Sequence, residues 1–93
     1  MKTKIIESGK YLKLIVSKTT IWYCRIRKRK KNETSLYDNK HNIIIELIIK
    51  DKNNYRFDET CIDVIEKLGF ENITFEEWSN ALKEFKVYVN KLK

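Results

Sequence analysis

Apolar and polar residues alternate with a period of two along most of the first half of the chain. A strand turns successive side chains to opposite faces of a sheet, so this period indicates β-structure. Segment 43–50 is apolar at nearly every position, which predicts a central strand. Polar or glycine-containing stretches separate the runs and predict turns. The expected strands are residues 3–7, 11–16, 21–29, 43–50 and 55–57.

The run at residues 21–29 carries two chemically different sets of side chains. Trp22, Cys24 and Ile26 fall on one face of the expected strand. The other face carries one aromatic ring and three cations, from Tyr23, Arg25, Arg27 and Arg29. One apolar face and one polar face are typical of an antiparallel sheet that packs on one side only.

The pattern changes to a helical period in residues 57–93. Gly69 stands where a left-handed residue would end a short helix at about 60–68. Thr74 and Glu77 have the spacing of a capping box at the start of a second helix, at about 75–92. Apolar residues recur along this second helix every three or four positions: Phe75, Trp78, Leu82, Phe85, Val89 and Leu92. The stripe predicts a helix packed on the sheet, with homodimerisation through the C-terminal helix as an alternative.

These elements predict one α+β domain spanning residues 1–93. An antiparallel sheet of about four strands, in residues 3–57, precedes the two C-terminal helices, and both helices pack on one sheet face. The expected core brings Trp78, Leu82 and Phe85 against Trp22, Ile45 and Leu47. The other sheet face is expected to stay open to solvent or to a partner.

Length and composition restrict the class of protein. A chain of 93 residues has no room for a separate cofactor domain or a large α/β fold. The 42% of apolar residues argue against disorder. The net charge of +7 is uneven: residues 1–56 carry fifteen Lys and Arg against five acids, and residues 57–93 carry five Lys against eight acids. The basic half is therefore the half expected to form the sheet.

We expect a cytoplasmic protein that does not enter a membrane. The N-terminal residues have no apolar core of a secretory signal, and the longest apolar run, 43–49, contains Glu46 and is far too short to span a bilayer. Cys24 and Cys61 lie far apart in apolar patterns, which favours buried, reduced thiols.

Catalysis is not expected from these residues. His41 is the single histidine and has no nucleophile motif beside it. Gly9 and Gly69 are the two glycines, so there is no phosphate-binding loop. The one His, the two Cys and the carboxylates do not have the spacing of metal ligands, and no cofactor is expected. A small metal-free ribonuclease toxin, handling phosphate with Arg, Lys and Tyr, is the one enzyme class that stays as an alternative.

Cations interleaved with aromatic residues point to nucleic acid as a partner. Three of the four arginines share one face of the expected strand at 21–29, and Arg binds phosphate with a planar fork and stacks on bases. Aromatic rings among cations on an open sheet would form a stacking platform. The predicted binding residues are Tyr11, Lys13, Tyr23, Arg25, Arg27, Lys28, Arg29, Lys30, Lys31 and Arg56.

Two other interpretations of this surface stay open. The cations can guard a solvated edge strand against aggregation. They can also contact an acidic protein or a nucleoprotein complex. The size and the Lys-, Ile- and Asn-rich composition resemble those of small phage and mobile-element proteins, anti-CRISPR proteins among them. An inhibitor or adaptor of this kind would act in the host cell cytoplasm by protein–protein contact.

Overall fold

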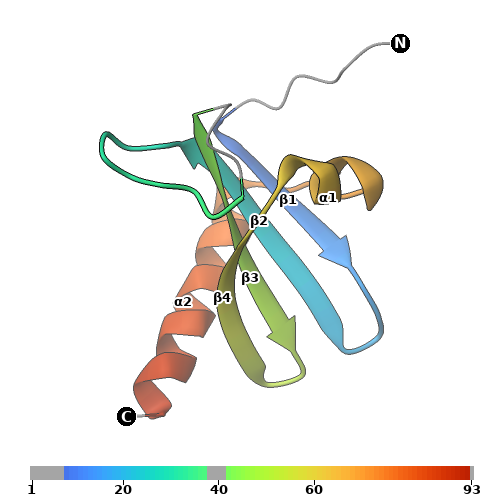
Figure 1. Ribbon diagram of the computed structural model, residues 1–93. Helices are drawn as coiled ribbons and strands as arrows, with labels where there is room; N and C mark the ends of the chain where they lie inside the picture. The colour runs from blue at the N-terminus through green and yellow to red at the C-terminus, as the bar shows by residue number, and fades with distance from the viewer. Residues whose placement is uncertain (1–7, 38–41, 93) are drawn as a thin grey trace.

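One antiparallel sheet with the order β4-β3-β2-β1-β5 organises the chain (Figure 1). The computed structural model describes residues 8–37 and 42–92. The strands are β1 (Lys10–Ile15), β2 (Thr20–Lys28), β3 (Ile43–Asp51), β4 (Asn54–Thr60) and β5 (Glu71–Asn72), and the helices are α1 (Ile62–Lys67) and α2 (Phe75–Lys91). The α+β class is confirmed. The strand predicted at residues 3–7 lies outside the described residues, and β5 was not predicted.

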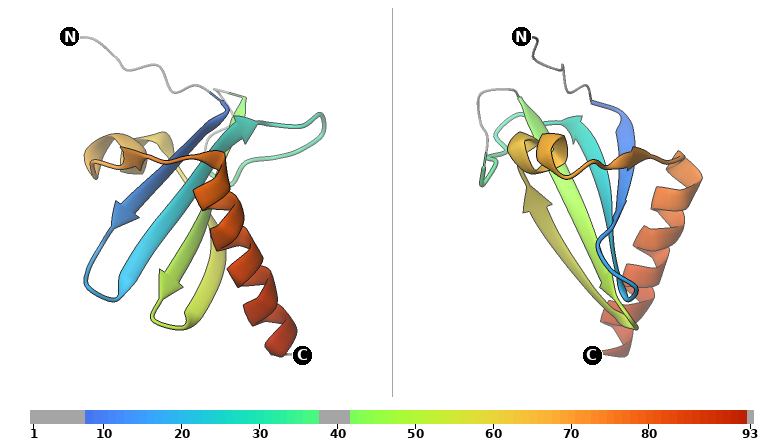
Figure 2. Two further views of the ribbon diagram at one scale, coloured as in Figure 1. Left: turned by 180° about the vertical axis from the view of Figure 1, so that it is seen from behind. Right: turned by 90° about the vertical axis from the view of Figure 1, so that its right-hand side faces the viewer.

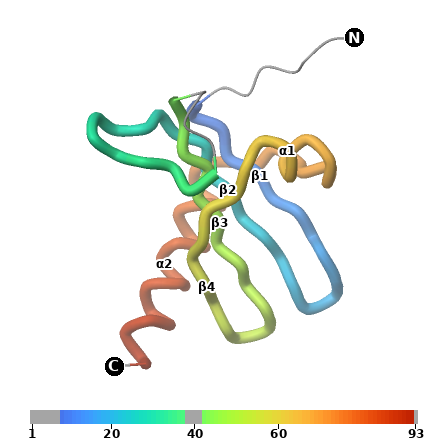
Figure 3. Tube along the Cα trace, viewed as in Figure 1, coloured from blue at the N-terminus to red at the C-terminus, as the bar shows by residue number. Residues whose placement is uncertain are grey.

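Hairpins connect the first four strands in sequence order. Leu12 faces Cys24, Cys24 faces Leu47, and Leu47 faces Asp58 across the sheet. The expected turn between β3 and β4 is confirmed, with Lys52-Asn53 as its two central residues. The chain trace then passes through α1 and crosses to the opposite edge, where β5 pairs with β1 before α2 begins (Figure 3).

The two helices lie on opposite faces of the sheet (Figure 2), so the prediction that both pack on one face is wrong. Ile65 of α1 is buried against an apolar cluster that also contains Leu12, Cys24, Ile26, Ile43, Ile45 and Leu47. Trp22 and Ile49 pack at the margin of this cluster. We call this side the α1 face.

The other side, which we call the α2 face, was expected to stay open. Trp78 and Ala81 of α2 are buried there with Ile48, and Tyr11, Tyr23, Tyr55, Leu82 and Phe85 pack around them. Trp78 therefore does not meet Trp22, Ile45 or Leu47, which belong to the α1 face. The reason lies in β3, since its isoleucines are buried on both faces and each face needs a cover.

Local signals position the helix ends as expected. The Thr74 side chain accepts a hydrogen bond of 3.1 Å from the Glu77 amide, which caps α2. Gly69 follows α1 with a φ of 66°, a left-handed conformation that glycine adopts without strain. The predicted capping box is incomplete, because the Glu77 carboxylate contacts Lys13 instead of the start of its own helix.

Candidate nucleic-acid interface

The aromatic part of the predicted stacking platform is covered by α2. The Tyr11 ring lies 5.5 Å from the Phe75 ring in an edge-on arrangement and 6.3 Å from the Trp78 ring. Tyr23 packs against the buried cluster of Ile48 and Trp78. Both tyrosines thus contribute to the core under α2, and neither offers an open ring face on the sheet for a base.

Two of the predicted cations on this face, Lys13 and Arg25, each contact one acid. Lys13 Nζ donates to Glu77 Oε2 at 2.8 Å, and this hydrogen bond raises the pKa of Lys13. Arg25 Nη1 lies 3.8 Å from Glu46 Oε1, a looser contact. The Lys13–Glu77 pair ties β1 to the first turn of α2, so Lys13 helps to hold the helix on the sheet.

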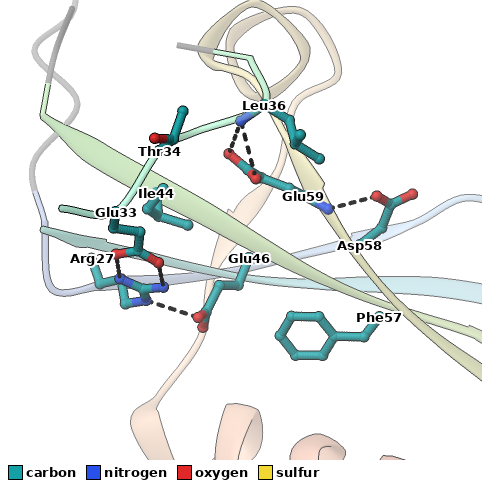
Figure 4. Close-up of a pocket in the computed structure, with 9 residues that line it drawn as sticks. All are labelled: Arg27, Glu33, Thr34, Leu36, Ile44, Glu46, Phe57, Asp58 and Glu59. Atoms are coloured by element: carbon teal, nitrogen blue, oxygen red, sulfur yellow. Dashed lines mark hydrogen bonds and ion pairs between the residues drawn. The ribbon is translucent and has the colours of Figure 1, made fainter. Parts of the chain in front are cut away.

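Arg27 is the most engaged cation on the α2 face (Figure 4). Its Nη1 and Nη2 atoms donate to the two carboxylate oxygens of Glu33 at 2.9 and 2.7 Å, and its Nε atom donates to Glu46 at 2.8 Å. Paired hydrogen bonds between a guanidinium and a carboxylate are among the strong contacts in proteins. Arg27 lowers the pKa of Glu33 to about 2, with help from the Lys30 backbone amide. Arg27 therefore serves as an internal clamp.

A tight turn at residues 30–33 brings Glu33 to this clamp. The Glu33 amide donates to the Lys30 carbonyl at 3.0 Å, and the Lys30 amide donates to the Glu33 carboxylate at 2.8 Å. Asn32 adopts a φ of 68°, a conformation that Asn tolerates better than most residues. The turn points Glu33 inward and leaves the Lys30 and Lys31 side chains exposed.

The other predicted cations gather at one end of the sheet, where β1 begins and β2 ends. Lys28, Lys30 and Lys31 are exposed and form no ion pair within the described chain. Arg29 lies beside them, with its guanidinium 3.3 and 3.4 Å from Asn42 Oδ1. Lys10, which was not predicted, pairs with Ile26 and so lies diagonally across from Lys28 on the α1 face. We call these five residues the basic end: Lys10, Lys28, Arg29, Lys30 and Lys31.

Arg56 does not join the predicted set. It pairs with Ile49 in the β3–β4 ladder, which places it on the α1 face, away from Arg25 and Arg27. The predicted surface is therefore divided among a covered core, the acid-paired Lys13 and Arg25, the Arg27 clamp, the basic end and one separate arginine. The acids Glu33, Glu46 and Glu77 were missed, because their partners depend on strand register and on the path of the chain.

A shallow cleft of about 330 Å³ adjoins the clamp. Arg27, Glu33, Thr34, Leu36, Ile44, Glu46, Phe57, Asp58 and Glu59 line it (Figure 4). Glu59 accepts hydrogen bonds from the Ser35 hydroxyl and the Leu36 amide, which attach the loop after β2 to β4. The carboxylates of Glu33, Glu46 and Glu59 against one arginine make the cleft acidic, so it is unsuited to phosphate.

Reactive groups are few in the described chain. Cys24 is buried, and burial raises the pKa of its thiol to about 12, so it stays neutral. Cys61 is half-buried and free. His41 lies outside the described residues. Residues 8–37 and 42–92 contain no group of three or more His, Cys, Asp or Glu side chains that could hold a metal ion.

Comparison of the chain with protein-family models, curated proteins and solved structures finds no match. Neither helix of the described chain combines the length and the apolar character needed to cross a membrane.

Proposed function

We propose that the protein is a non-enzymatic nucleic-acid-binding protein that contacts the phosphate backbone with its basic end. The observation that carries the proposal is the collection of five cations at one end of the sheet, four of them lysines without an ion pair in the described chain. This end is distant from the C-terminal turn of α2 (Figure 1). The cytoplasm is the compartment we propose for this activity.

The geometry favours phosphate recognition over base recognition. Exposed lysines offer mobile point charges, which suit phosphates and carry little sequence information. Because Tyr11 and Tyr23 pack under α2, base stacking on the sheet does not contribute. The proposed binding is therefore tolerant of sequence and strongly dependent on salt.

Fluorescence anisotropy with labelled duplex and single-stranded probes over a salt series tests the proposal. Three to five phosphate contacts give a slope of about −3 to −4.5 for the logarithm of the duplex binding constant against the logarithm of salt concentration. The triple variant Lys28→Ala, Lys30→Ala, Lys31→Ala is expected to lose most of the affinity and to flatten the slope by about three units. All three side chains are exposed, so the variant should fold.

The matched control is the triple variant Lys83→Ala, Lys86→Ala, Lys91→Ala. It removes the same charge from exposed positions of α2. Equal loss of affinity in both variants would show that net charge, and not the basic end, governs binding. Absence of binding by the wild-type protein at low salt would overturn the proposal. Probes that are cleaved during the assay would favour the ribonuclease alternative.

A second candidate function is inhibition of nucleic-acid machinery through protein contact. Leu36 and Tyr37 are 77% and 54% exposed, and they follow the basic end in the same loop. Exposed apolar and aromatic side chains beside cations are typical of protein interfaces. A pull-down from host lysate with and without nuclease separates the candidates. A protein that stays bound after nuclease treatment, and is lost in the Leu36→Ser, Tyr37→Ser variant, favours the inhibitor.

A further inference from the structure

Strand β4 forms an edge of the sheet in the described chain, with β3 as its neighbour on one side and no strand on the other. Its middle residues Arg56, Phe57 and Asp58 are exposed. The unpaired amide and carbonyl groups of an edge strand can pair with another chain, unless the edge is covered or guarded by charge. The exposed middle of β4 is therefore a candidate for pairing with a strand of another chain.

The turn between β3 and β4 determines which backbone groups point outward. A two-residue turn closes on a hydrogen-bonded pair, here Asp51 and Asn54, and such pairs then alternate along the ladder. Tyr55, Phe57 and Glu59 consequently direct their amide and carbonyl groups away from β3. The Glu59 amide agrees with this, since it donates to the Asp58 side chain at 2.8 Å and not to β3.

We infer that the chain forms a homodimer by antiparallel pairing of β4 with β4 of a second copy, around a twofold axis at Phe57. This inference is independent of nucleic-acid binding. A closed twofold interface requires one strand to complement itself. In this register Phe57 faces Phe57 of the partner subunit as a hydrogen-bonded pair, which agrees with the outward direction of its backbone groups.

Charge selects this register over its neighbours. With the axis at Phe57, Arg56 lies directly opposite Asp58 of the partner subunit, and the twofold repeats the pair. These are non-hydrogen-bonded positions, where side chains approach most closely. An axis at Arg56, Asp58 or Glu59 would instead place like charges opposite each other. Arg56 and Asp58 have no ion pair in the described chain, and Asp58 accepts only the local hydrogen bond from the Glu59 amide.

The same twofold axis also brings the lysines of α2 in one copy toward the acidic cleft of the other. The C-terminal half of α2 lies over the start of β4, where Tyr88 donates to Asn54 and the Phe85 ring lies 5.5 Å from Phe57. The acidic cleft lies at the end of β4 on the same face. Antiparallel pairing brings the start of one β4 to the end of the other. The exposed Lys83, Lys86 and Lys91 of one copy are thus carried toward the acidic cleft of its partner.

Sedimentation analysis over a concentration range of about 1 µM to 1 mM tests the dimer. Arg56→Asp places the new carboxylate opposite Asp58 of the partner subunit, and the twofold axis repeats this repulsive pair. The variant is expected to weaken the dimer about tenfold. The double variant Arg56→Asp, Asp58→Arg restores opposite charges and should restore dimerisation. Lys18→Asp, at the exposed turn after β1, makes the same charge change away from the edge and serves as the control.

Cross-linking tests the position of the axis directly. In a Cys61→Ser background, Phe57→Cys places two thiols on adjacent strands at a hydrogen-bonded pair, where Cα atoms lie about 5.5 Å apart and a disulfide can form. Asn54→Cys, exposed on the same strand, lies far from its copy and should form no intermolecular disulfide under oxidation. A wild-type protein that is monomeric at every concentration would overturn the inference. A dimer indifferent to Arg56→Asp, or one that the double variant fails to restore, would overturn the register.

Discussion

Each face of the sheet is covered by a helix, but different kinds of side chain pack on the two faces. The α1 face is a continuous apolar cluster closed by a helix of six residues. The α2 face has a buried cluster of three residues, Ile48, Trp78 and Ala81, on a face that also carries tyrosines, a lysine and arginines, and a helix of 17 residues lies across it. A face that alternates cations with tyrosines can therefore still be an interior face.

The reason lies in the shape of those side chains. Tyrosine, lysine and arginine carry apolar stems or rings with a polar tip, so their bodies can pack while their tips find partners. On the α2 face the tips find Glu77 for Lys13, and Glu33 with Glu46 for Arg27. Among the described residues, the α1 face shows no such ion pair and depends on apolar burial. The comparison predicts different sensitivities of the two faces to substitution.

Truncation of Trp78 is expected to have the largest effect. Trp78 is 1% exposed and is the largest fully buried side chain, so Trp78→Ala should lower the free energy of unfolding by about 3–5 kcal/mol. Ile65→Ala, from the short helix of the α1 face, should lower it by about 2 kcal/mol. Urea denaturation followed by circular dichroism measures both. A larger effect of Ile65→Ala than of Trp78→Ala would show that α1, and not α2, contributes more to the stability of the sheet.

The Arg27 clamp is expected to have an intermediate effect. Arg27→Gln leaves Glu46 and Glu33 without their main partner and should lower the free energy of unfolding by about 1–3 kcal/mol at neutral pH. Because the folded pKa of Glu33 is lowered to about 2 from 4.5, its share of the stabilisation is complete above about pH 4.5. That share is lost as the pH falls toward 2.

Denaturation curves of wild-type protein and Arg27→Gln from pH 7 to pH 2 therefore should converge at the acidic end. Arg25→Gln is the control, since the distance of Arg25 Nη1 to Glu46 Oε1 is 3.8 Å and the Arg25 side chain is 40% exposed. It should cost less than about 1 kcal/mol and show little pH dependence. A constant difference between wild type and Arg27→Gln across this range would contradict the role of ionised Glu33.

Loss of the α2 cap is expected to have the smallest effect. Thr74→Ala removes the acceptor for the Glu77 amide and should lower the free energy of unfolding by about 1 kcal/mol. Thr74→Ser keeps the oxygen and should retain most of the stability. Thermal denaturation of the two variants measures the difference. Equal stability of both variants would show that the Thr74 hydrogen bond adds nothing to the Lys13–Glu77 pair and the ring contacts of Tyr11 at this end of α2.

Strands 11–16, 21–29 and 43–50 could be predicted nearly to their observed bounds, since a period of two is a local property of the chain. Strand β4 extends beyond the expected 55–57, to Thr60, because pairing with β3 continues through a sequence with little alternation. Strand β5 has two residues, too few to show the alternation from which a strand is predicted. Apolar residues on both sides of β3 were the one signal that both faces are covered.

The candidate site was predicted only in part for a related reason. The cations at 28–31 were recognised from the sequence alone, because a charge run needs no partner to be exposed. Lys13 and Glu77 are 64 positions apart, and Arg27 and Glu46 are 19 apart. Such pairs depend on register between strands and on the path from β4 to α2, which local patterns do not contain.

The sequence by itself determined the α+β class, the strands β1 to β3, the long C-terminal helix with its Thr74 cap, and the concentration of charge in the first half. Each depends on neighbours within a few residues, through side-chain periodicity and hydrogen bonds near helix ends. Only the tertiary structure decided that α2 covers the tyrosine and arginine face. The crossing at β5 delivers α2 to that face, and burial of Trp78 on Ile48 then holds it there.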